Sequence, residues 1–129
     1  MRYLTASQIL LIHSMLIDEH GGSHGVRERN LIASLEQLPA QKAFGKELYP
    51  TIYLKSAVYA RNIITSHPFF DGNKRTGITC AAISLENNGY VFDAKEGELE
   101  HYAILIAREK PELKEIAAWL KTHSKRKRS

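Results

Sequence analysis

Cysteine is nearly absent from this sequence: Cys80 is the only one in 129 residues. A single thiol cannot form a disulfide within the chain, which is typical of proteins of a reducing compartment. The sequence also lacks any apolar run that approaches the length of a membrane span, and its first residues, MRYLTASQ, have neither the apolar segment nor the cleavage site of a signal peptide. We therefore expect a cytoplasmic protein without membrane contact.

Several motifs of common enzyme families are missing as well. There is no glycine-rich dinucleotide fingerprint, no phosphate-binding P-loop and no helix with the HExxH pattern of zinc peptidases. A chain of 129 residues can bury one core but is too short for a cofactor domain and a separate substrate domain. Any chemistry therefore depends on a site within a single domain.

Acidic residues are slightly outnumbered, with 14 of them against 18 lysines and arginines. Four of the cations, at positions 125–128, are consecutive, and the rest of the chain has 14 residues of each sign. We therefore divide the sequence into a helical domain over residues 1–124 and a basic tail over residues 125–129. A solvated tail is the simpler interpretation, and a weak contact with RNA or an acidic partner is the alternative. No specific nucleic-acid binding is expected.

Apolar residues recur at helical spacing through most of the chain. Thr5 and Gln8 have the form of a capping box, Pro39 and Pro68 follow the second and third periodic segments, and Asn88-Gly89 follows the fourth. The predicted helices run from this box to about Glu19, from Val26 or Arg27 to about Leu38, from Thr51 to Ser66, from Asn73 or Lys74 to Asn88, from about Glu98 to Arg108, and from Pro111 or Glu112 to His123. The pattern predicts an all-α fold: a compact single-domain bundle of about six helices.

The remaining segments and isolated reactive residues have simpler interpretations. AQKAFGKELYP, at positions 40–50, lacks clear periodicity and predicts an exposed loop beside the functional site, whereas YVFDA is short enough to be extended. We interpret His13 and His101 as helix-surface residues. Cys80 lies among small and apolar residues inside a predicted helix, which favours core packing over a nucleophilic role.

The stretch from His67 to Gly77, HPFFDGNKRTG, carries more polar side chains than a connection between helices needs. A turn uses glycine and asparagine because they tolerate positive φ, but it has no use for a histidine, an acid and two adjacent cations. Pro68 biases His67 away from helical geometry, so His67 lies just past a helix end. The motif loop is therefore expected between two central helices, with Phe69 pointing into the core as its anchor.

An anion site is the chemistry that these residues favour. Residues 71–74 would present successive backbone N–H groups at the start of a helix, where unpaired donors and the positive end of the dipole attract an anion such as phosphate. Gly72 allows the backbone to curl into a nest. Lys74 and Arg75 add a point charge and a planar fork that suits phosphate oxygens.

Asp71 and His67 supply the groups that a reaction would need. An acid beside an anion site is explained if it holds the Mg²⁺ that accompanies nucleotide phosphates. Histidine is the side chain whose charge changes nearest to neutral pH, so His67 is the residue best suited to take a proton from an attacking hydroxyl.

HPFFDGNKR resembles the signature of the Fic/Doc family, H-x-F-x-[D/E]-[G/A]-N-[G/K]-R, at every position. RERNLIASLEQLP, LYP, NNGY and AAWLK extend the resemblance to the death-on-curing (Doc) branch over most of the chain. The resemblance implies a compact helical fold, ATP and Mg²⁺ as cofactors, and transfer of a phosphate-containing group to a protein hydroxyl. The segment from Ala43 to Pro50 would correspond to the family's flap, which lies beside the target peptide.

The resemblance also implies roles for single residues. The family's general base falls on His67 and its metal-linked acid on Asp71, while the asparagine and arginine of its anion site fall on Asn73 and Arg75. Members that transfer AMP usually have glycine where this chain has Lys74 and a second arginine where it has Ile78. Doc-type phosphotransferases resemble this chain at both positions, so the lysine and the missing arginine disfavour AMP transfer.

The expected protein is thus a Doc-like toxin of a toxin–antitoxin pair, a kinase that phosphorylates a serine or threonine of a translation factor and arrests translation. Elongation factor Tu is the target that the resemblance implies. No Ser/Thr-x-x-x-Glu pattern, the mark of an internal inhibitory helix in Fic proteins, occurs in the sequence, so a separate antitoxin is expected to restrain the toxin. An AMP transferase and a non-catalytic binding module on the same scaffold are the alternatives.

Overall fold

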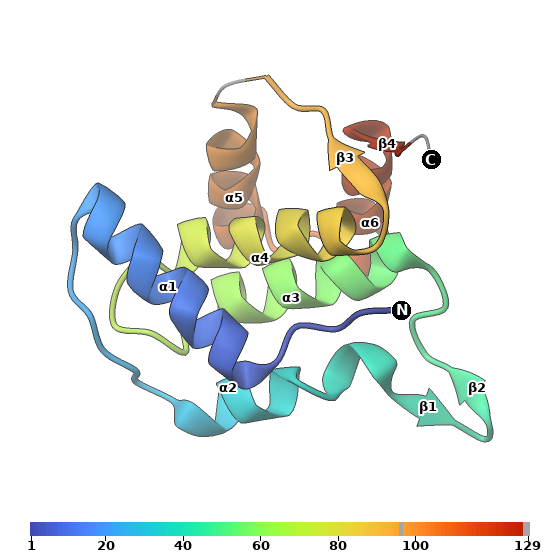
Figure 1. Cartoon of the computed structure of the whole chain (residues 1–129), viewed down its shortest axis with the longest axis horizontal. Helices are drawn as coiled ribbons and strands as arrows, with labels where there is room; N and C mark the ends of the chain where they lie inside the picture. The colour runs from blue at the N-terminus through green and yellow to red at the C-terminus, as the bar shows by residue number, and fades with distance from the viewer. Residues whose placement is uncertain (96, 128–129) are drawn as a thin grey trace.

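Two antiparallel helices, α3 (Ile52–Ser66) and α4 (Asn73–Asn87), cross the middle of the molecule (Figure 1). The computed structural model describes residues 1–95 and 97–127. Four further helices cover this central pair: α1 (Ala6–His20) and α2 (Arg29–Leu35) on one side, and α5 (Glu98–Glu109) and α6 (Leu113–Thr122) on the other. The described residues thus form six α-helices, which confirms the predicted helical bundle.

Most helix boundaries follow from local sequence. The Thr5 hydroxyl accepts the Gln8 backbone N–H at 3.1 Å, and the Gln8 side chain accepts the Thr5 N–H at 2.9 Å, so the predicted capping box is present. Thr51 caps α3 in a similar way, by accepting the Leu54 N–H. These caps satisfy donors that a helix start would otherwise leave unpaired.

The second helix begins later than the sequence predicts, at Arg29 instead of Val26 or Arg27. The backbone N–H groups of Arg27 and Glu28 both donate to the Pro68 carbonyl, at 2.7 and 2.9 Å, and Val26 forms an isolated antiparallel bridge with Phe69. Residues 26–28 are therefore bonded to the motif loop and are not helical. This long-range pairing overrides the local helical pattern.

The prediction for residues 40–50 was wrong in two respects. After a 3₁₀ turn (Leu38–Ala40) the chain forms a hairpin of β1 (Lys42–Ala43) and β2 (Lys46–Glu47), with Phe44 and Gly45 at positive φ in the two-residue turn. Figure 1 shows this hairpin near the N-terminal end of α3, whereas the motif loop follows its C-terminal end. The hairpin is therefore not beside the motif.

Two apolar clusters fill the spaces on either side of α3 and α4. One joins them to α5 and α6, and the other joins them to α1 and α2. Gly77 allows α3 and α4 to approach, since a Cβ at this position would lie 2.6 Å from Ile64 Cγ1 and 3.1 Å from the Ala60 carbonyl oxygen. Cys80 is fully buried in the second cluster, as predicted, and burial raises the pKa of its thiol to about 12.

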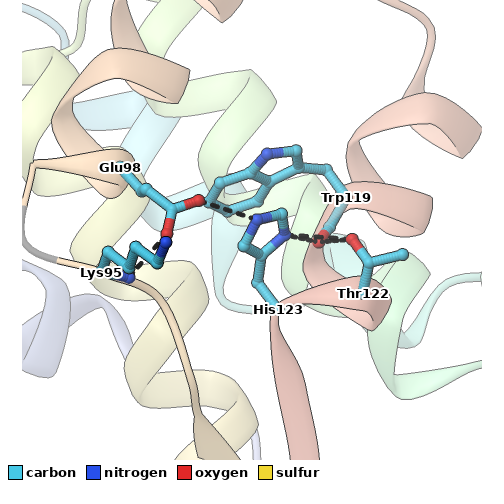
Figure 2. Close-up of polar contacts among 5 residues, drawn as sticks. All are labelled: Lys95, Glu98, Trp119, Thr122 and His123. Carbon is cyan, nitrogen blue, oxygen red and sulfur yellow. Dashed lines mark hydrogen bonds and ion pairs between the residues drawn. The ribbon is translucent and has the colours of Figure 1, made fainter.

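Residues 124–127 fold back onto the bundle, and the last two residues of the predicted basic tail lie outside the described residues. β4 (Ser124–Arg126) pairs antiparallel with β3 (Tyr90–Phe92), so Lys125 and Arg126 of the basic segment belong to a strand. Figure 2 shows His123 between two helices: its Nδ1 lies 2.8 Å from the Trp119 carbonyl and its Nε2 lies 3.1 Å from a carboxylate oxygen of Glu98. These contacts connect the end of α6 to the start of α5.

None of the helices in the described part of the chain is both long enough and apolar enough to cross a membrane.

Candidate active site

A cavity of about 400 Å³ opens where the end of α3 meets the start of α4. The motif contributes His67 and residues 70–75 to its walls, and α5 contributes Glu100, Ala103 and Ile104. All the site residues expected from the sequence (His67, Asp71, Gly72, Asn73, Lys74 and Arg75) therefore line one cavity.

His67 occupies an unusual backbone position at the end of α3. Its φ of 53° and ψ of 60° are left-handed, a region that residues with a Cβ rarely adopt. The side chain is exposed, and its imidazole makes no hydrogen bond within the part of the chain that the structure describes. The ring nitrogens are thus free to contact a substrate in the cavity.

Phe69 and Asn73 hold the loop from the inside. Phe69 is buried in the core, as predicted. The Asn73 side-chain oxygen accepts the Phe69 N–H at 3.0 Å, and its amide nitrogen donates to the Phe69 carbonyl at 2.9 Å. Both ends of this amide therefore bind the loop, and the donors left to Asn73 for an anion are its backbone N–H and the second N–H of the side-chain amide.

The start of α4 has the geometry of an anion site. Gly72 is the N-cap at a φ of 78°, and a Cβ there would lie 3.0 Å from Ile17. The N–H groups of the first helical turn lie where donors are unpaired and the dipole is positive. Lys74 is exposed, and Arg75 contacts Glu100 at 3.4 Å in a half-exposed ion pair, which is weak enough for a phosphate to replace.

Asp71 is held by backbone donors on both carboxylate oxygens. Oδ1 accepts the Gly72 N–H at 2.9 Å, and Oδ2 accepts the Ser23 N–H at 3.1 Å. No group of three or more metal-ligating side chains occurs among the described residues. A single carboxylate nevertheless fits Mg²⁺, which commonly binds through one or two carboxylates together with substrate phosphates and water.

His13 is a site residue that the sequence analysis missed. It was expected on a helix surface, but it is 3% exposed, and its ring stacks on Phe69 at 3.7 Å between centroids. Its Nε2 donates to the Asp71 carbonyl at 2.8 Å. Position 13 lies four residues from both Ile9 and Ile17 on the buried face of α1, and this spacing was the available signal.

We expect His13→Phe to destabilise the protein by about 1–3 kcal/mol, because the new ring keeps the stacking surface but removes a part-buried hydrogen bond and leaves the Asp71 carbonyl without its donor. Urea unfolding of the variant and the wild type measures this difference. His20→Phe, at an exposed position of the same helix, is the control and should be near neutral. Equal stability of His13→Phe and wild type would show that the hydrogen bond contributes nothing.

Comparisons with known proteins show the family of this chain. Residues 3–85 match the Fic/DOC family. Toxin Doc of Mycolicibacterium smegmatis is 30% identical over 87 residues, which cover 67% of this chain and 65% of that protein. Protein kinase doc of Escherichia phage P1 is 30% identical over 98 residues, covering 74% of this chain and 76% of the phage protein. The matched family region spans the motif, α3 and nearly all of α4, though not α5, and this chain belongs to the Fic/DOC family.

Proposed function

We propose that this protein is a Doc-like toxin that transfers the γ-phosphate of ATP to a serine or threonine of a translation factor, for which elongation factor Tu is the candidate. The observation that carries the proposal is the convergence of all six expected site residues on one cavity, whose lining includes both His67 and the positive start of α4. The names of the two relatives, a toxin and a protein kinase, support the same conclusion.

The two positions that separate the possible chemistries favour phosphate transfer. Lys74 lines the cavity, where a glycine would leave more room for the distal phosphates in the orientation needed for AMP transfer. Ile78 is 2% exposed and belongs to the core cluster that joins α3 and α4 to α5 and α6. It offers no second cation to bind those phosphates.

Each residue has a defined task in the proposed reaction. His67 accepts the proton of the target hydroxyl as its oxygen attacks the γ-phosphorus, and ADP leaves with the electrons of the broken P–O bond. The N–H groups at the start of α4, together with Lys74 and Arg75, hold the phosphates in place. Mg²⁺ held by Asp71 would neutralise charge on those phosphates.

We further propose that a separate antitoxin restrains the enzyme. A toxin needs an inhibitor in the cell that makes it, and the sequence lacks the Ser/Thr-x-x-x-Glu pattern of an internal one. A peptide segment that folds as it binds is the kind of partner expected.

The proposal is tested by incubating elongation factor Tu with the protein, ATP and Mg²⁺, and measuring the intact mass of the target. We expect addition of one phosphate, and none when Mg²⁺ is omitted. Addition of AMP would replace the kinase by an AMP transferase. If the target is unmodified, thermal unfolding with ATP and Mg²⁺ decides further: a raised midpoint indicates a different target, and an unchanged midpoint supports the non-catalytic binding module.

A further inference from the structure

The end of α3 is held from outside by a residue that lies beyond the motif. The Arg27 side chain donates from Nε to the His67 carbonyl at 2.8 Å and from Nη2 to the Ser66 carbonyl at 2.9 Å. The Arg27 backbone N–H donates to the Pro68 carbonyl at 2.7 Å. One residue therefore binds three consecutive carbonyls, with His67 in the middle.

The sequence of the motif explains why these donors are needed. The last carbonyls of a helix have no partners within it, and a residue in left-handed conformation after a helix is usually followed by one whose N–H bonds back to the final turn. Here that following residue is Pro68, which has no N–H. Only the His67 N–H bonds back, to Ile63 at 3.3 Å, so Arg27 supplies donors that the chain end of α3 lacks.

The conformation of His67 also needs support. A left-handed backbone places the Cβ of any residue except glycine close to its own chain, so it persists only where the surroundings fix it. The same dihedral angles determine the direction in which the imidazole leaves the backbone. A fixed carbonyl on each side of His67 therefore fixes the direction of its Cα–Cβ bond, which limits the positions that the ring can reach.

We propose that Arg27 is a positioning residue that holds the His67 backbone in its left-handed conformation and so directs the imidazole toward the target hydroxyl. The inference rests on the proposed function, in which His67 accepts the proton. Arg27 is not among the residues that line the cavity, and its Nη1 lies 3.7 Å from a Glu28 carboxylate oxygen. The guanidinium thus contacts the end of α3 and the carboxylate of Glu28, and it does not face the cavity.

Steady-state kinetics of Arg27→Ala and Arg27→Lys test the role. We expect the kcat of both to fall by about 10²-fold with KM for ATP unchanged, because a misplaced base slows the chemical step without weakening nucleotide binding. Lysine keeps the charge but lacks the planar fork that binds two carbonyls. Added guanidinium ion should partly restore Arg27→Ala. Arg29→Ala, an exposed arginine at the start of α2, is the matched control with normal kcat.

Two kinetic results would overturn the inference. A raised KM for ATP at normal kcat would show that Arg27 binds nucleotide, and an Arg27→Ala variant as active as Arg29→Ala would show that the contacts do not position the base.

A second measurement keeps the inference separate from the proposed reaction. The backbone ¹³C chemical shifts of His67 in the free protein report whether φ is positive, and they need no substrate. We expect them to change in Arg27→Ala and not in Arg29→Ala, while the signals of α6 stay unchanged. If the wild type modifies no target, the proposed function fails, and these shifts still decide whether Arg27 holds His67; unchanged shifts would refute it.

Discussion

His67→Ala is expected to lower the rate of target phosphorylation by ~10²–10⁴-fold, the usual effect of removing a general base. The imidazole lines the cavity, and it has no hydrogen bond within the described residues that its removal would break. Folding and ATP binding should therefore be preserved. The rate is measured by transfer of labelled γ-phosphate to the target. Thermal unfolding with and without ATP checks that the variant is folded and binds ATP.

The matched control for His67→Ala is His101→Ala, which removes an exposed histidine from α5 outside the cavity. This variant should phosphorylate at the wild-type rate. If His67→Ala retained the wild-type rate in the same assay, His67 would not be the base, and the proposed mechanism would lose its proton acceptor.

Lys74→Gly should lower phosphorylation by ~10²–10³-fold, since it removes the positive charge that the proposed mechanism uses to stabilise the transferring phosphate. Lys74 is exposed to the cavity at the second position of α4. Glycine also reopens space for the distal phosphates, but the chain still has Ile78 in place of the second arginine that would bind them. The firm expectation is the loss of kinase activity.

The measurement uses ATP labelled separately at the α- and γ-phosphates, with the label on the target as the readout. Lys114→Gly is the matched control, because Lys114 is the second residue of α6 and is also exposed. It reproduces the loss of stability that a glycine causes in a helix, without changing the cavity. Transfer of the α-label by the wild type would establish AMP transfer instead. An unimpaired Lys74→Gly kinase would show that Lys74 is only a solvated charge.

The helices and the cavity could be predicted because their determinants are local. The Thr5 capping box and the Pro68 stop set helix ends through neighbouring residues. Once Pro68 ends one helix and Gly72 begins the next, the motif has to lie at their junction. Six expected site residues line the cavity for this reason.

The remaining features depend on contacts between distant parts of the chain. Arg27 is not helical because it binds carbonyls about forty residues away, and nothing near it in the sequence encodes that partner. The amide of Asn73 turns toward Phe69, although its place in the motif suggested a phosphate contact. His13 was misplaced because its polarity was given more weight than its spacing from Ile9 and Ile17.

Because of its position, Cys80 can report how often α4 separates from the helices packed against it. It is the chain's only thiol, it is fully buried on α4, and its high pKa leaves almost no thiolate at neutral pH. A thiol-specific reagent can therefore react only in molecules in which α4 has separated from its neighbours. The labelling rate then measures the population of opened molecules. This rate distinguishes two kinds of inactive motif variant. A variant with the wild-type labelling rate has lost only its catalytic group, whereas a variant that is labelled faster has lost the packing of the helices that form the site.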